Sequence, residues 1–184
     1  MTTDKQIRVA VLLGSSRAGS LNRRIAEHLR DNAPARVTVD VVEGIDAVPF
    51  YNEEIDGDAA PASATALRQA VASADRVLAV TPEYNGTMPA VLNNAIDWLS
   101  RPYGQGAIVG KPFAAIGATP TPYGGKWSHE HARHSATIAG AIVVEGIVVD
   151  EPAVDGDPLE DEAAVRRFLD ALDALVAHQA DVAA

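Results

Sequence analysis

An apolar run from Ile7 to Leu13 is the feature that most limits how this chain can fold. Apolar residues follow one another there almost without a break, and Gly14 ends the run. Strands with one solvated face alternate apolar and polar residues, whereas strands covered on both faces read as near-continuous apolar segments. The run therefore indicates a strand inside a parallel sheet that has helices on both faces.

Helical spacing replaces the strand pattern after Ser20. Leu21, Ile25 and Leu29 recur every four residues, as expected of one apolar helix face. Ser20 is a suitable N-cap for this helix, and Pro34 is expected to stop it. The first strand is thus followed at once by a helix, which is the beginning of a βαβ unit.

The rest of the chain keeps alternating between the two patterns. Further strands are expected at residues 37–41, 77–81, 113–116 and 141–149, and further helices at about 61–74, 89–99, 127–139 and 159–177. Gly146 is interpreted as a bulge in the last of these strands. Helices between strands give crossovers long enough for parallel pairing, so we expect one doubly wound α/β domain over residues 1–184.

Two loops with unusual chemistry, residues 14–22 and 82–87, follow the first and third strands. Open parallel sheets bind ligands beyond the carboxyl ends of their strands, where the winding reverses. In the six-stranded dinucleotide order the third strand lies at an edge, whereas in the order 2-1-3-4-5 it lies beside the first. Placing both loops in one site therefore predicts a flavodoxin-like, five-stranded parallel sheet of order 2-1-3-4-5.

The first loop, "GSSRAGSLN", resembles a nucleotide phosphate loop that lacks its lysine. Backbone N–H groups and the dipole at the start of a helix stabilise a phosphate there. Side chains of the loop add donors and one fixed charge: Ser15, Ser16, Arg17, Ser20 and Asn22. Without the lysine, and with Thr81 and Pro82 where a magnesium-binding acid would stand, the loop favours a terminal phosphate monoester over ATP. A capped turn without a ligand remains the alternative.

The second loop, "PEYNGT", places a rigid turn, an aromatic ring and backbone amides beside the expected phosphate site. A flat heteroaromatic ring needs apolar packing along its face and hydrogen bonds along its edge. The segment therefore suits such a ring. Its Asn85-Gly86 pair also fits a tight turn that does no more than lead into the next helix.

Three segments resemble, in order and spacing, the NADPH-dependent FMN reductase family, which includes chromate, quinone and azo-dye reductases. They are "GSSRAGSLNRRIA", "TPEYNGTMPAVLNNAIDWLSRP" and "GKPFAAIGATP". The resemblance covers the chain from Ile7 to about Val149. It implies a flavodoxin-like fold, FMN as cofactor, NADPH or NADH as co-substrate, and a small-molecule electron acceptor such as a quinone, flavin, chromate or azo compound.

The resemblance also implies a set of site residues. The FMN phosphate would be held by Ser15, Arg17, Ser20, Leu21 and Asn22. The isoalloxazine ring would be lined by Pro82, Glu83, Tyr84, Asn85 and Gly86, with Thr119 near its other edge. Because the flavin performs the redox chemistry, no catalytic acid, base or nucleophile is assigned. A homodimer or homotetramer is implied, with the helix after "PEYNGTMP" at the interface and Arg101 tying subunits together.

Two other functions use parts of the same pattern. A flavodoxin-like electron carrier would bind FMN with the same loops but would not turn over nicotinamide. A Rossmann dehydrogenase would place Asp40 or Glu43 on a ribose, but the chain lacks GxGxxG and this function leaves "PEYNG" unexplained. No basic contact to the 2′-phosphate of NADPH is evident, so NADH stays an alternative donor.

Composition excludes several classes of function. The absence of cysteine excludes disulfides, thiol redox chemistry and thiolate metal sites. The formal net charge of −10 opposes binding to nucleic acid and to anionic membranes. The first residues lack the features of a signal peptide, and no apolar run is long enough to span a bilayer, so a cytoplasmic protein is expected.

Three histidines, His129, His131 and His134, raise the question of a metal site. The HExxH pattern fails because Arg133 stands where its second histidine belongs. His129 does not share the helix face of the other two, and no clear carboxylate partner is apparent in the sequence. We therefore predict no metal site and interpret the segment as a solvated or interface helix.

Overall fold

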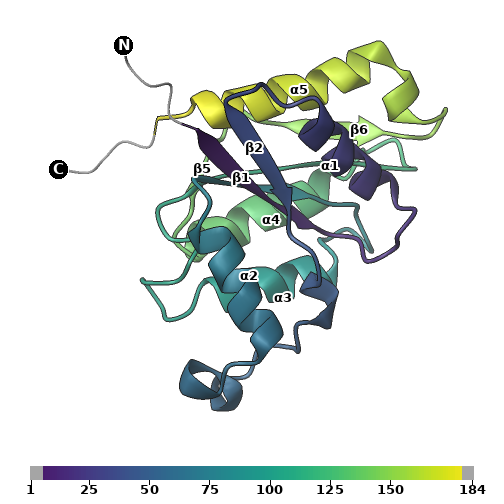
Figure 1. Cartoon of the computed structure of the whole chain (residues 1–184). Helices are drawn as coiled ribbons and strands as arrows, with labels where there is room; N and C mark the ends of the chain where they lie inside the picture. Colours follow the sequence, from purple (N-terminus) through teal and green to yellow (C-terminus); the bar gives the residue numbers. More distant parts are fainter. Residues whose placement is uncertain (1–5, 180–184) are drawn as a thin grey trace, which may run out of the picture.

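Six strands form one parallel sheet in the computed structural model, which describes residues 6–179 (Figure 1). The strands are β1 (Ile7–Leu13), β2 (Val37–Val41), β3 (Arg76–Val80), β4 (Pro112–Thr119), β5 (Ile142–Val143) and β6 (Val149–Pro152). Their order is β2-β1-β3-β4-β5, with β6 also paired to β4. This confirms the expected order 2-1-3-4-5. β1 is an inner strand, between β2 and β3, and its residues from Val9 to Leu13 are buried.

The far edge of the sheet differs from the prediction, because two short strands replace the single strand expected at 141–149. β5 pairs with the start of β4 and β6 with its end. Between them the chain turns, with the Ile147 N–H donating to the Val144 carbonyl at 3.1 Å. The apolar pattern is the same on both sides of this turn, so it concealed the break, and Gly146 lies in the turn rather than in a bulge. As a result β6 carries Asp150 and Glu151 alongside the end of β4.

Five helices cover the two faces of the sheet (Figure 1). They are α1 (Leu21–Asp31), α2 (Ala62–Ala72), α3 (Ala90–Leu99), α4 (Lys126–Ile138) and α5 (Glu162–Ala177). α1 and α5 pack together on one face, and α2, α3 and α4 lie on the other. Short 3-10 turns occur as η1 (Ile45–Ala47), η2 (Glu53–Ile55), η3 (Gly57–Ala59) and η4 (Pro158–Glu160). Within residues 6–179 no helix combines the length and apolarity needed to span a bilayer.

The helix starts follow the sequence signals. The Ser20 side chain accepts the N–H of Arg23 at 3.1 Å, which makes it the N-cap of α1 as predicted. α1 ends at Asp31, before Pro34, and α3 begins directly after Pro89. A side-chain cap stabilises a helix by about 1 kcal/mol. Ser20 therefore fixes where the first loop stops and α1 begins.

The long segment between β2 and α2 is fastened to α3. Trp98 is fully buried in α3, and its indole N–H donates to the Pro49 carbonyl at 2.8 Å. Arg68 of α2 lies over the Trp98 ring and makes a forked pair with Asp56 at 2.7 and 2.9 Å. The Arg68 guanidinium lowers the pKa of Asp56 from 3.8 to about 2. This pair holds the end of the segment against the body of the protein.

The Arg68–Asp56 pair is expected to give stability that acid removes. Asp56 is ionised in the folded protein down to about pH 2, so the pair contributes fully above the ordinary carboxyl pKa and its contribution is lost as the pH falls from about 4 towards 2. Arg68→Met should lower the free energy of unfolding at neutral pH by roughly 1–3 kcal/mol, and this difference should shrink over that range. Urea unfolding at several pH values measures it. Arg30→Met, which removes an exposed pair with Asp31, should cost much less, because solvent screens an exposed ion pair; equal losses would contradict this explanation.

Candidate functional site

The two loops meet at the carboxyl ends of β1 and β3. Leu13 pairs with Val80, and the Gly14 N–H donates to the Val80 carbonyl at 2.9 Å. A Cβ atom on Gly14 would lie 1.9 Å from Thr81 Oγ1, so only glycine lets the two strand ends approach this closely. The loops at 14–20 and 82–87 therefore start side by side, as the strand order predicted.

The first loop presents several polar groups that have no protein partner. The backbone N–H groups of Leu21 and Asn22 meet no acceptor among the hydrogen bonds of residues 6–179. Ser15 Oγ is buried and also lacks a partner. Arg17 is exposed, and its guanidinium makes neither a hydrogen bond nor an ion pair within the described chain, although its carbonyl accepts the Ser20 N–H. Donors of this kind at the start of a helix form an anion site. The residues present therefore fit a phosphate group.

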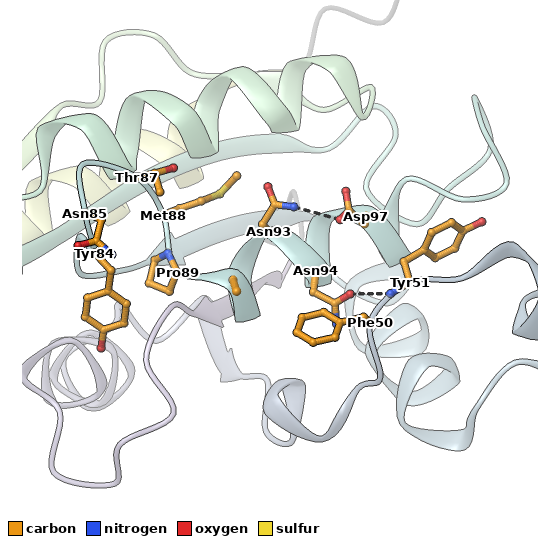
Figure 2. Close-up of a pocket in the computed structure, with 11 residues that line it drawn as sticks. Phe50, Tyr51, Tyr84, Asn85, Thr87, Met88, Pro89, Asn93, Asn94 and Asp97 are labelled. Atoms are coloured by element: carbon orange, nitrogen blue, oxygen red, sulfur yellow. Dashed lines mark hydrogen bonds between the residues drawn. The ribbon is translucent and has the colours of Figure 1, made fainter.

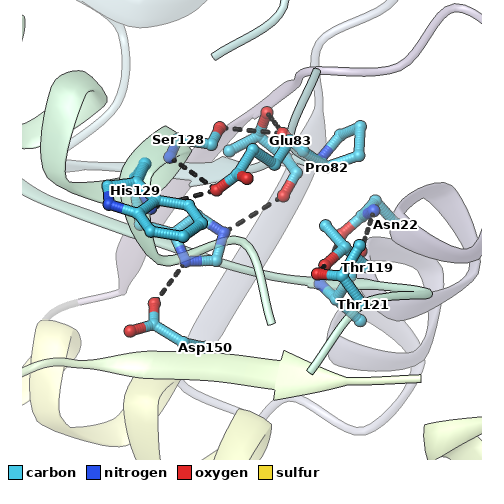
Figure 3. Close-up of polar contacts among 11 residues, drawn as sticks. Asn22, Pro82, Glu83, Thr119, Thr121, Ser128, His129 and Asp150 are labelled. Carbon is cyan, nitrogen blue, oxygen red and sulfur yellow. Dashed lines mark hydrogen bonds and ion pairs between the residues drawn. The ribbon is translucent and has the colours of Figure 1, made fainter. Parts of the chain in front are cut away.

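Asn22 also has a structural role that the sequence did not reveal. Its side chain is buried, donates to the Ala118 carbonyl at 2.9 Å and accepts the Ala118 N–H at 3.0 Å (Figure 3). Both ends of the amide are thereby used to join α1 to the end of β4. Asn22 can offer a phosphate its backbone N–H, while Ser20, which accepts from Arg23, still has a hydroxyl hydrogen to donate.

Replacing Asn22 by alanine should therefore affect stability as well as binding. The change leaves the N–H and carbonyl of Ala118 buried without partners, and we expect the free energy of unfolding to fall by about 2–3 kcal/mol. Chemical denaturation measures the loss. Asn93→Ala is the control, because Asn93 is exposed and only donates to Asp97; it should change stability by less than about 0.5 kcal/mol. Equal effects of the two variants would contradict the structural role.

The second loop is a tight turn that exposes Tyr84. The backbones of Tyr84 and Thr87 pair in both directions, at 3.0 and 3.1 Å. Asn85 and Gly86 at the tip have positive φ values of 53° and 72°, as this turn requires. Their N–H groups have no acceptor among the described hydrogen bonds. The turn that the sequence predicted is present, and it leaves two backbone donors and an aromatic ring available.

Contacts with α4 hold the start of the second loop in place (Figure 3). Glu83 Oε2 accepts the N–H groups of Trp127 at 3.0 Å and Ser128 at 3.3 Å. Ser128 Oγ donates to the Pro82 carbonyl at 2.8 Å. The Glu83 carboxylate thus caps α4, and its negative charge interacts favourably with the positive end of the helix dipole. Pro82 and Glu83 are thereby positioned by a helix more than 40 residues further along the chain, a connection that no local pattern indicates.

Thr119 ends β4 at the same edge of the sheet. It is buried, and its hydroxyl lies 2.9 Å from that of Thr121 (Figure 3). Thr119 follows directly after Ala118, to which Asn22 is bound. The structure therefore brings the expected ring-edge residue to the same end of the sheet as both loops.

An open cavity of about 660 Å³ adjoins the second loop (Figure 2). Its lining comes from the 50–51 segment, the turn at 84–88 and the exposed side of α3: Phe50, Tyr51, Tyr84, Asn85, Thr87, Met88, Pro89, Ala90, Asn93, Asn94 and Asp97. Phe50 is 78% exposed. Burial raises the pKa of Asp97, which also accepts a hydrogen bond from Asn93 at 3.0 Å. The cavity thus has an aromatic ring at each end, with Tyr84 at one end and Phe50 and Tyr51 at the other, beside the polar groups of Asn94 and Asp97.

His129 corrects one expectation from the sequence. It is fully buried, and its Nδ1 lies 2.6 Å from Asp150 Oδ1, so the histidine has a carboxylate partner and is not on a solvated face. The partner was missed because the predicted strand ended at residue 149, which left Asp150 outside the predicted sheet, whereas it lies in β6. His131 and His134 are exposed, and His131 Nδ1 lies 2.8 Å from Thr87 Oγ1. The described residues contain no cluster of three metal-ligating side chains.

Comparisons with known proteins agree with this geometry. The profile of the NADPH-dependent FMN reductase family matches residues 7–155. The chain is 43% identical over 127 residues to a quinone reductase of Pseudomonas putida, covering 69% of this chain and 68% of that protein. It is 42% identical over 127 residues to a 2-hydroxy-1,4-benzoquinone reductase of a Burkholderia species, with the same two shares.

Solved structures show the same fold. FerB, a flavoenzyme NAD(P)H:(acceptor) oxidoreductase from Paracoccus denitrificans, superposes with a TM-score of 0.75 and 30% identity, covering 94% of this chain and 98% of that one. A flavodoxin from Pseudomonas aeruginosa, at 18% identity and a TM-score of 0.58, covers 91% of this chain and 99% of that one and supports the fold alone. Because the family match spans residues 7–155 and includes both loops of the site, the chain belongs to the NADPH-dependent FMN reductase family.

Proposed function

We propose that this protein is an FMN-dependent oxidoreductase that takes electrons from NADPH or NADH and passes them to a quinone or another small acceptor. The observation that carries the proposal is the open anion site at the start of α1, next to an exposed turn that suits a flat ring. The family match and the similarity to quinone reductases support it. An electron carrier without nicotinamide turnover is less favoured, because these relatives are named as reductases.

The phosphate of FMN binds at the first loop. Its proposed contacts are the side chains of Ser15, Arg17 and Ser20 and the backbone N–H groups of Leu21 and Asn22. Every one of these groups except the Ser20 oxygen lacks a protein partner within the described residues. Binding therefore satisfies donors that are otherwise unpaired, and the Arg17 charge offsets the negative charge of the chain.

The ring of FMN lies against the second loop. Its proposed contacts are Pro82, Glu83, Tyr84, Asn85 and Gly86, with Thr119 near the other edge. When bound, the flavin supplies the hydride and electron chemistry, and the protein supplies position and electrostatics. The free N–H groups of Asn85 and Gly86 donate to the ring edge, where they favour negative charge. No side chain needs to transfer a proton for this role.

The acceptor is proposed to enter the cavity beside Tyr84. Phe50 and Tyr84 provide aromatic surface for a flat molecule, and the amide of Asn93 provides a donor for a carbonyl oxygen. This arrangement favours a quinone over chromate, because the residues that line the cavity include the carboxylate of Asp97 and no basic side chain. Steady-state kinetics with 1,4-benzoquinone and chromate should show the higher kcat/KM for the quinone.

Three broader proposals concern the domain organisation, the assembly and the location of the protein. We propose that residues 1–184 form one FMN-binding domain, since a single sheet connects all the described strands. We propose a homodimer or homotetramer through the surface around Tyr103 and Ile138, which are 78% and 65% exposed. Light scattering measures the number of subunits in solution and so tests the proposed assembly.

We also propose a cytoplasmic location, because NADPH and NADH are supplied there.

Turnover with an acceptor separates the reductase from the carrier. Protein loaded with FMN should oxidise NADPH or NADH continuously when a quinone is present, as followed by loss of the nicotinamide absorbance. A carrier would pass electrons to the quinone after chemical reduction but would leave both nicotinamides untouched. That second result would overturn the proposed function.

A further inference from the structure

His129 lies completely buried in the first turn of α4, and both of its ring nitrogens face oxygen atoms (Figure 3). Nδ1 lies 2.6 Å from the Asp150 carboxylate, and Nε2 lies 3.1 Å from the Thr81 carbonyl. A carbonyl oxygen and an ionised carboxylate can only accept hydrogen bonds. Both contacts are therefore hydrogen bonds only if each ring nitrogen carries a hydrogen atom and donates it.

A neutral imidazole has one N–H and one lone pair, so it can serve only one of these partners. The other contact would then place two lone pairs against each other inside the protein, where unpaired polar groups are costly. The Asp150 side chain keeps 20% of its surface exposed, so its carboxylate stays partly hydrated and can remain ionised. A ring that donates from both nitrogens satisfies both contacts.

We propose that His129 is a buried imidazolium ion that acts as a positioning residue for the flavin site, holding the start of the second loop and favouring negative charge on the bound FMN. The effect on FMN rests on the proposed function, whereas the charge state of the ring is independent of it. Thr81, which receives the Nε2–H, immediately precedes Pro82 and Glu83 of the second loop.

The residues packed around the His129 ring place its positive charge on the side that faces the proposed flavin site. A Cβ atom on Gly117 of β4 would lie 3.1 Å from Nε2, and one on Gly125 would lie 3.0 Å from Cε1. The ring thus touches the ends of β3 and β4, which border the site, while Asp150 approaches it from β6 on the other side (Figure 3). The positive member of the pair is thus the one that contacts Thr81, the residue that precedes the second loop.

Other groups near the ring are consistent with this charge. Glu83, from the second loop, is bound to the N–H groups of Trp127 and Ser128 in the same turn of α4. From α1 the neighbouring group is the neutral amide of Asn22, which shares Gly117 as a neighbour with the histidine. Of the acidic groups, Asp150 thus contacts the ring itself, and Glu83 is bound to the turn of α4 that carries it. Loss of the imidazolium would leave them without its positive charge.

Nitrogen NMR of the FMN-free protein tests the charge state directly. The ring nitrogens of His129 are assigned in ¹⁵N-labelled protein by comparison with His129→Gln, and exposed His134 is the internal reference. Near neutral pH we expect both His129 nitrogens to show the shifts of protonated imidazole nitrogens. One protonated and one unprotonated nitrogen would overturn the inference, whatever the protein does with FMN.

The effect on FMN is tested by comparing oxidised with reduced cofactor. Glutamine can donate to the Thr81 carbonyl but carries no charge, so His129→Gln keeps the packing contact and removes the imidazolium. We expect the affinity for reduced FMN to fall about tenfold relative to that for oxidised FMN, which corresponds to a midpoint potential lower by about 30 mV. His134→Gln, on the exposed side of the same helix, should leave the ratio unchanged.

The outcomes separate this inference from the proposed function. An unchanged affinity ratio in a folded His129→Gln protein would reduce His129 to a packing role and overturn the electrostatic one. Failure of the wild-type protein to bind FMN at all would contradict the proposed function, and the NMR result would still decide the charge on His129. If His129→Gln does not fold, spectroelectrochemistry of His129→Asn gives the same comparison.

Discussion

Replacing Arg17 by alanine will weaken FMN binding by roughly tenfold to 150-fold, or about 1.5–3 kcal/mol. The Arg17 guanidinium is exposed and has no partner among residues 6–179, so its charge is available to a phosphate. In a chain of net charge −10, few other fixed charges favour an anion at this position. Titration of the FMN-free protein, followed by flavin fluorescence, measures the change.

Riboflavin provides the sharpest control for this prediction. It has the same ring as FMN but no phosphate, so Arg17→Ala should bind it as the wild type does. Arg30→Ala, which changes an arginine near the other end of α1 that is paired with Asp31, should leave the affinity for FMN unchanged. Equal losses for FMN and riboflavin would show that Arg17 acts on the ring or on the fold, and no loss for either would place the phosphate elsewhere.

Replacing Gly117 by alanine should cause the largest loss of stability, about 3 kcal/mol or more. The new Cβ atom would lie 2.2 Å from the Thr81 carbonyl oxygen and 2.6 Å from Asn22 Oδ1. The first of these belongs to the backbone at the end of β3, which is itself hydrogen-bonded to Ile116. The protein can accept the methyl group only by separating the strand ends that carry the site. Affinity for FMN should therefore fall with stability.

Gly19→Ala is the matched control for Gly117→Ala. Gly19 lies in the first loop, and a Cβ atom there would meet nothing within 4 Å. The change should alter the free energy of unfolding by less than about 1 kcal/mol, with a small gain if the loop backbone accepts alanine. Denaturant unfolding of both variants makes the comparison. A Gly117→Ala protein as stable as Gly19→Ala would contradict the close packing of Thr81 against β4.

The strand order could be predicted because two loops with ligand-binding residues were expected to form one site. Residues 14–22 and 82–87 each carry ligand-binding chemistry, and only the order 2-1-3-4-5 places them side by side. Helix boundaries followed from Ser20 and Pro89, whose effects are local. Patterns of this kind involve only residues that are close in the sequence, so they can be recognised without the tertiary structure.

The rest of the site depends on contacts between distant residues. Asn22 was expected at a phosphate, but its side chain is bound to Ala118, 96 positions further along the chain. The partner of His129 is Asp150, which lies 21 residues away in β6, just beyond the end of the strand predicted at 141–149. Such pairings arise from tertiary packing and leave no periodic signal in the sequence.

Anaerobic reduction of the FMN-loaded protein by NADPH or NADH tests the central claim most directly. We expect the protein to bind FMN and at least one of the two nicotinamides to bleach the absorbance of the oxidised flavin. A protein that cannot be loaded with FMN, or that keeps its FMN oxidised in the presence of both nicotinamides, would contradict it.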